Sequence, residues 1–195
     1  MDLGWGNAHA SKWATNVGLI TSDGPCGPNI AAVEWTYYVS YSPALISIHL
    51  GGTTKNASGK ATLDNIRATK EFGVSLAASD QNAISSIAGG SSGKEVDKIG
   101  LLREFGAKFT EGKQAKVLLL DGAASTAECR VKEITDVGDH VMILGEVLEM
   151  ESHEEKQPLI YSFGKYYGLG GKIGKPEQAI LDRIAALKEK YAKKK

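Results

Sequence analysis

One short stretch of the chain combines residue types that could bind a phosphate group. The sequence Ser58-Gly59-Lys60-Ala61-Thr62 places a cation and a hydroxyl where a glycine-containing loop leads into a segment of helical spacing. At a helix start, free backbone N–H groups and the positive end of the helix dipole attract anions. We therefore predict a phosphate site at Lys60, Ala61 and Thr62, with Asn65 as a further candidate. The same residues also fit an ordinary capped helix without a ligand.

Patterns that would indicate other kinds of active site are missing from the sequence. No GxxxxGK[ST] phosphate loop occurs. The glycines of 168–174 have their third member one position late for a dinucleotide fingerprint, so this stretch predicts a turn. The four histidines lack paired metal-ligand spacing, and Cys26 and Cys129 form no CxxC motif. Neither a zinc site nor a disulfide framework is expected.

Composition limits the possible partners. The 195 residues carry 23 basic and 23 acidic side chains, so the formal net charge is zero. A broad basic surface for nucleic acid or anionic lipid is therefore not expected. No apolar run approaches the roughly 20 residues of a membrane helix, and the first residues do not resemble a secretory signal. These features predict a single domain over residues 1–195, located in the cytoplasm, with no membrane or nucleic-acid partner.

The elements that must position the phosphate site are mostly short strands. Runs of β-branched and aromatic residues bounded by turn formers predict strands within 16–22, 29–40, 44–50, 72–76, 116–120, 125–134 and 140–150. Between them, helices are expected over 62–70, capped by Thr62, and over 81–88. This spacing favours a mainly β fold, a closed or nearly closed antiparallel barrel, over a doubly wound sheet.

The C-terminal segment carries a helical pattern. Pro176 suits a first helical turn, and Ile180, Ile184, Leu187 and Tyr191 recur at intervals of three and four residues. We predict an amphipathic helix over 176–192. Its apolar stripe could cover the barrel of its own chain or pack on a second subunit, and the sequence leaves both arrangements open.

Six motifs in a fixed order carry a family resemblance. They are VGLITSDG at 17–24 with NIAAVEW at 29–35, GKAT at 59–62 with EFGV at 71–74, SGKEVDK at 92–98, ECRV at 128–131, GDH at 138–140 with GEV at 145–147, and PLIY at 158–161 with GKYY at 164–167. In this order the chain resembles the flavin reductase-like FMN-binding proteins, which include flavoredoxins and archaeal ferric reductases. The resemblance implies a Greek-key-like FMN-binding split β-barrel that pairs as a homodimer.

The resemblance also implies a cofactor site. Small side chains at Ala31 and Ala32 would let the flat flavin ring lie close to a strand, and backbone N–H groups from Val33 to Thr36 would bind its polar edge. His140 is the candidate catalytic residue, on the nicotinamide side of the flavin. The remaining candidates for cofactor binding are Glu34, Trp35, Ser47, His49, Thr53, Thr54, Lys55, Asn56, Lys60, Ala61, Thr62, Asn65, Ser92 and Lys98.

The activity implied is electron transfer from NAD(P)H through bound FMN to free flavin, ferric iron or a protein acceptor. Hydride transfer to a flavin needs no obligatory acid or base, so the lack of a catalytic dyad agrees with it. Two alternatives remain at this stage. One is a flavoredoxin-like electron carrier without efficient NAD(P)H turnover, and the other is a flavin-free barrel used as a binding module.

Overall fold

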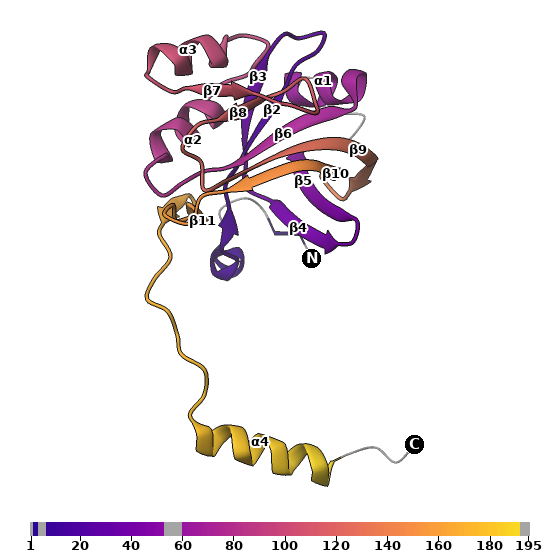
Figure 1. Cartoon of the computed structure of the whole chain (residues 1–195). Coiled ribbons are helices and arrows are strands. Elements are labelled where there is room, and N and C mark those ends of the chain that lie inside the picture. The colour runs from indigo at the N-terminus through magenta and orange to yellow at the C-terminus, as the bar shows by residue number, and fades with distance from the viewer. Residues whose placement is uncertain (1, 4–6, 53–59, 192–195) are drawn as a thin grey trace.

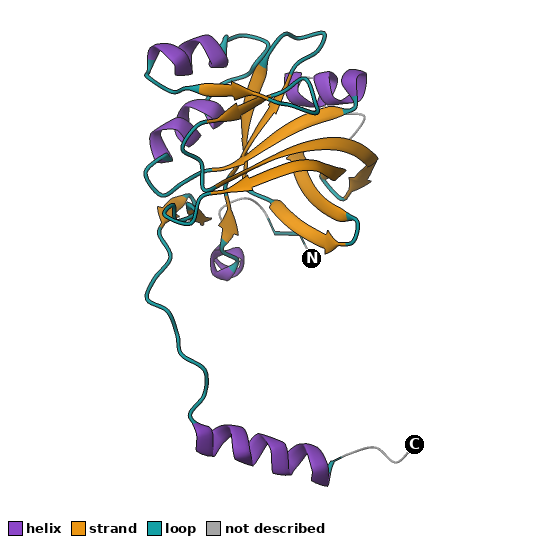
Figure 2. Cartoon of the chain, in the orientation of Figure 1, coloured by secondary structure: helices purple, strands orange, loops and turns teal. Residues whose placement is uncertain are grey.

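A curled, seven-stranded antiparallel sheet forms the body of the molecule (Figures 1 and 2). The computed structural model describes residues 2–3, 7–52 and 60–191, so the predicted site residues Thr53, Thr54, Lys55 and Asn56 lie outside the described residues. Along the sheet the strands are β3 (Asn29–Val33), β2 (Gly18–Ser22), β6 (Glu71–Leu76), β9 (Ser125–Val137), β10 (His140–Ser152), β5 (Ala44–Gly51) and β4 (Thr36–Tyr41). The mainly β, antiparallel fold class is thus confirmed.

Smaller elements surround this sheet (Figure 2). Two small sheets are formed by β1 (Thr15–Asn16), β11 (Ile160–Ser162) and β12 (Lys165–Tyr167), and by β7 (Phe109–Glu111) and β8 (Leu118–Leu120). The helices next to the sheet are α1 (Ala61–Thr69), α2 (Asn82–Gly89) and α3 (Lys98–Glu104), and a 3₁₀ turn spans Ala8–Lys12. Of these elements, α3, β1, β7, β11 and β12 were not expected from the sequence.

Two apolar clusters fill the interior on opposite faces of the sheet. Successive residues of a strand point to opposite faces, so the neighbours Leu19 and Ile20 enter different clusters, and both are fully buried. The cluster around Ile20 includes Phe72, whose ring lies where a side chain at position 145 would otherwise stand; Gly145 leaves that space open. The cluster around Leu19 lies under α2 and α3. Burial on both faces makes β2 a fixed support for its neighbour β3.

The segment predicted as a single strand over 29–40 is broken in the structure. It divides into β3 and β4 at Glu34 and Trp35, and the hydroxyl of Thr36 donates to the carbonyl of Val33 at 3.0 Å across the break. After the break the chain continues at the opposite edge of the sheet: β3 lies at one edge of the seven strands and β4 at the other. The break leaves Glu34 and Trp35 outside the registered strand pairs.

The helix cap expected at Thr62 is wrong by two residues. Lys60 is the N-cap of α1, and Thr62 lies buried in the first turn, where its hydroxyl has a partner outside the helix. At its other end the helix stops at Lys70, in the left-handed region at φ 62°, whose N–H donates to the carbonyl of Ile66. The helix itself was predicted correctly, and its start faces the site described below.

The C-terminal helix α4 (Gln178–Lys190) forms where its periodicity predicts, within two residues at each end. Figure 1 shows it away from the β body, at the end of an extended segment. It has no buried residue, and Ile184 and Leu187 are 40% and 43% exposed. Of the two arrangements that the sequence left open, α4 does not adopt the one in which it covers the barrel of its own chain. In the described part of the chain, no helix is long and apolar enough to cross a membrane.

Candidate functional site

A pocket of about 900 Å³ opens beside the edge strand β3. Its walls come from β3 and the break after it, the starts of α1 and α3, the end of α2, and the β11–β12 hairpin. The pocket brings together most of the predicted site residues: Ala31, Ala32, Val33, Glu34, Trp35, His49, Lys60, Ala61, Thr62, Ser92, Lys98 and His140. Residues that are distant in the sequence thus share one cavity.

One end of the pocket, which we call the anion end, joins Asn29 of β3 to Thr62 at the start of α1. The side-chain amide of Asn29, itself buried, donates to the hydroxyl oxygen of Thr62 at 2.8 Å. Because that oxygen is accepting a hydrogen bond, the hydroxyl hydrogen of Thr62 is directed elsewhere. Among the described residues the Oδ1 atom of Asn29 is a buried side-chain oxygen with no hydrogen-bond partner. Sequence reasoning missed Asn29, although it opens the NIAAVEW motif.

Two lysines add positive charge at this end. Lys98 is 3% exposed, and its ammonium group donates to the carbonyl of Ala88 at 2.9 Å. Burial, together with the nearby charge of Lys60, lowers the pKa of Lys98 to about 8, and burial also lowers the pKa of Lys60. Within residues 2–3, 7–52 and 60–191, neither ammonium group forms an ion pair with a carboxylate. A buried cation without a counter-ion is costly, and a bound dianion would remove that cost.

Small residues of β3 line one wall of the pocket. Ala31 and Ala32 both line the pocket, and Gly89, at the end of α2, lies next to Ala32. A β-carbon at Gly89 would lie 3.4 Å from the β-carbon of Ala32, in ordinary contact, so the missing side chain widens the gap by about one methyl group. Next to this wall, Glu34 and Trp35 lie outside the registered strand pairs, and the carbonyl of Trp35 accepts a hydrogen bond from the N–H of His49 at 3.0 Å. A planar ring with a polar edge fits such a wall.

Aromatic and titratable side chains surround the other end of the pocket. Trp35 stacks on His140 with ring centroids 4.4 Å apart, and Nδ1 of His140 lies 2.7 Å from a carboxylate oxygen of Asp139. That hydrogen bond and the charge of His140 lower the pKa of Asp139. Burial raises the pKa of Glu34, an effect that His140 opposes. Burial and the charge of His140 also lower the pKa of His49. This end therefore carries titratable groups around an aromatic stack.

A glycine separates the two ends. A β-carbon at Gly51 would lie 3.5 Å from the ammonium nitrogen of Lys60 and 3.7 Å from Nε2 of His140. A larger residue would occupy the space between the cation and the imidazole. The missing side chain leaves space between Lys60, at the anion end, and His140, which with Trp35 marks what we call the ring end.

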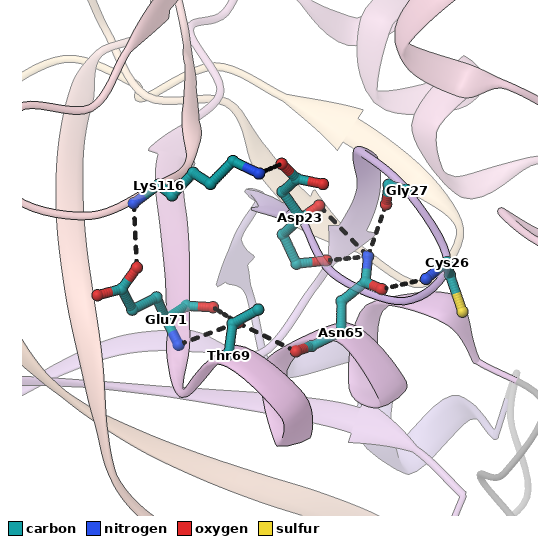
Figure 3. Close-up of polar contacts among 8 residues, drawn as sticks. Asp23, Cys26, Gly27, Asn65, Thr69, Glu71 and Lys116 are labelled. Carbon is teal, nitrogen blue, oxygen red and sulfur yellow. Dashed lines mark hydrogen bonds and ion pairs between the residues drawn. The ribbon is translucent and has the colours of Figure 1, made fainter.

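Three predicted site residues do not line the pocket. Thr36 is buried in the β3–β4 break, and Ser47 is buried with its hydroxyl 3.4 Å from Nε2 of His49. Asn65 holds the turn after β2: its side chain donates to the carbonyls of Ser22 and Gly27 and accepts from the N–H of Cys26 (Figure 3). The hydrogen-bonding capacity of Asn65 is therefore used inside the protein.

A comparison with family models gives one match, described as a flavin reductase like domain, over residues 10–170. The chain belongs to the flavin reductase-like family. The matched residues end before α4. The match gives the chain the class of a flavin reductase oxidoreductase, as the motifs implied.

Relatives of this flavin reductase-like chain are distant in sequence. It is 26% identical over 163 residues to an FMN reductase (NADH), RutF, of Cronobacter sakazakii, covering 84% of this chain and 90% of that protein. An uncharacterised protein of Archaeoglobus fulgidus is 26% identical over 123 residues, 63% of this chain and 64% of that protein. Among solved structures, the NADH:FAD oxidoreductase SgcE6 of Streptomyces globisporus superposes with a TM-score of 0.70 at 21% identity, covering 82% of this chain and 88% of the other. These similarities agree with the split-barrel fold.

Proposed function

We propose that the protein is an NADH-dependent flavin reductase that holds FMN in the pocket beside β3. Its single strongest support is the charge arrangement at one end of the pocket, where Lys60 and Lys98 lie close together without a carboxylate partner in the described part of the chain. A phosphate dianion would receive hydrogen bonds there from both lysines and from the hydroxyl of Thr62. The first backbone N–H groups of α1 would add to this attraction.

The pocket walls also fit the rest of FMN. The isoalloxazine ring would lie against Ala31 and Ala32, with its polar edge on the backbone N–H groups of Glu34 and Trp35. A bound flavin supplies a two-electron acceptor for the hydride of a reduced nicotinamide. The protein holds the two rings in contact and excludes water from between them. On this assignment His140, stacked on Trp35, lies on the nicotinamide side.

The choice of FMN and NADH rests on the anion end and on the relatives. A monophosphate with two negative charges matches two ammonium groups and one hydroxyl. RutF of Cronobacter sakazakii, of which the alignment with this chain covers 90%, carries the name FMN reductase (NADH). The electrons then pass to free flavin, ferric iron or a protein acceptor, and we further propose that the protein works as a homodimer.

A titration tests this function directly. We expect FMN added to the purified protein to show a shifted visible absorption band, and the released ligand to have the mass of FMN. Under anaerobic conditions, one equivalent of NADH should bleach that band, and excess NADH with free FMN should be oxidised continuously. Bleaching without steady turnover would instead favour the electron carrier. A colourless protein that ignores both FMN and FAD would contradict the proposal.

A further inference from the structure

The hairpin that closes one side of the pocket has an unusual residue at its tip. Ser162 of β11 pairs with Lys165 of β12, so Phe163 and Gly164 form a two-residue loop. Both have positive φ, 51° and 76°, which is the backbone of a type I′ turn. The first position of such a turn favours Asn, Asp or Gly, because a larger side chain is strained in the left-handed region. Phe163 at this position therefore destabilises the free protein.

The side chain of Phe163 gains little from its surroundings in return. It is 46% exposed, yet it lines the pocket. Phe163 thus destabilises the free protein in two ways: its apolar ring is half exposed to water, and its backbone is strained. Backbone strain of this kind concentrates at ligand sites, where binding provides the compensating interaction. Because Phe163 lines the pocket, a ligand bound there can contact its ring.

The base of the hairpin is held firmly. Tyr166 of β12 packs edge-on against Tyr161 of β11, with ring centroids 5.4 Å apart. The hydroxyl of Tyr166 donates to the hydroxyl oxygen of Ser85 in α2 at 3.1 Å. These contacts fix the position of the hairpin relative to α2. The end of α2 forms another wall of the same pocket. A ring on such a support loses little conformational freedom when it stacks on a ligand.

We propose that Phe163 stacks on the planar ring system of the dinucleotide substrate, and this inference rests on the proposed function. At about 900 Å³ the pocket is near the upper end of the 300 to 1,000 Å³ range of ligand pockets, so it has room for a second ring beyond the flavin. The wall formed by β3 receives the first ring. Phe163, which is half exposed in the loop between β11 and β12, is positioned to contact the ring that enters last.

The test compares Phe163→Asn with Phe163→Tyr in the full chain. Asn suits the left-handed region, so we expect the melting temperature of Phe163→Asn to rise by about 2–4 °C. The same variant should bind FMN as tightly as the wild type. Loaded with FMN, it should bind NAD⁺ about threefold to tenfold more weakly by calorimetry, the usual size of one aromatic stacking contact. Phe163→Tyr, which keeps the ring, should retain wild-type affinity for NAD⁺.

The possible results separate the two proposals. Equal NAD⁺ affinity of Phe163→Asn and the wild type would overturn the role of Phe163 and leave the flavin reductase proposal intact. An equal loss of FMN and NAD⁺ affinity would assign the ring to the flavin and likewise overturn it. Size-exclusion chromatography with light scattering adds one more check, because a change from dimer to monomer would place Phe163 in a subunit interface. A wild type that binds neither FMN nor FAD would contradict the proposed function itself.

Discussion

The two ends of the pocket differ in the kind of interaction they offer. At the anion end, Lys60, Lys98 and Thr62 present charge and a directed hydroxyl. At the ring end, the pocket is lined by small residues of β3 and by Trp35, which stacks on His140. Charge contributes most to affinity where it is buried and lacks a partner, whereas flat surfaces mainly fix orientation. The contrast implies that the anion end determines how tightly the cofactor binds and the ring end determines how it reacts.

The largest expected effect comes from removing the side chains that bind the phosphate at the anion end. Lys60→Ala combined with Thr62→Ala deletes two charge-assisted hydrogen bonds, so FMN affinity should fall by about 100-fold or more. Riboflavin has the same ring but no phosphate, and its affinity should change little. Fluorescence titration of both ligands measures the difference. Equal weakening of FMN and riboflavin would contradict the phosphate assignment.

A smaller effect, with a pH signature, is expected at Lys98. Lys98→Met should weaken FMN binding by about tenfold at pH 7, because it removes one buried charge. The pKa of Lys98 in the free protein is about 8, below the ordinary lysine value. Raising the pH from 7 to 9 therefore deprotonates Lys98 and should lower the affinity of the wild type for FMN.

Riboflavin and the variant provide the controls for that pH dependence. Riboflavin binding to the wild type should be nearly constant between pH 7 and 9, since it has no phosphate to pair with the ammonium group. FMN binding to Lys98→Met should depend less on pH than FMN binding to the wild type. Identical pH profiles for FMN in both proteins would show that another group titrates.

At the ring end, added volume should act on both flavins alike. Ala32→Leu introduces a branched side chain at the pocket wall next to Gly89, and overpacking of this kind costs about 1–3 kcal/mol. FMN and riboflavin should each bind about fivefold to tenfold more weakly. Circular dichroism melting checks that the fold persists. A loss confined to FMN would place the ring elsewhere.

The smallest effect is expected from His140→Ala. The imidazole packs on Trp35 and bonds to Asp139 at the pocket wall. Its loss should lower kcat/KM for NADH by about threefold, the scale of a single ring contact, and leave FMN affinity unchanged. Stopped-flow reduction of the bound flavin measures this step. A loss of FMN affinity would move His140 to the cofactor side.

The fold was more predictable than the site because periodicity determines strands and helices, whereas site contacts are formed over long distances in the sequence. Alternation and turn residues predicted β2, β5, β6 and β10. Lys60 and Thr62 could be found because they are neighbours in sequence. The Asn29–Thr62 hydrogen bond joins residues 33 positions apart, so no local pattern contains it. Asn65 was assigned to the phosphate because its capacity for hydrogen bonds is visible in sequence, but its partners in the 22–27 turn are not.

The place of β3 at the rim of the sheet has a consequence for handling the protein. Among the described strands β3 has a neighbour on one side only, and unpaired strand edges promote association between molecules. A flavin lying along that edge would occupy the surface through which two chains could otherwise pair. We expect the cofactor-free protein to aggregate faster on mild heating than the FMN-loaded protein, so that a colourless preparation also becomes turbid first.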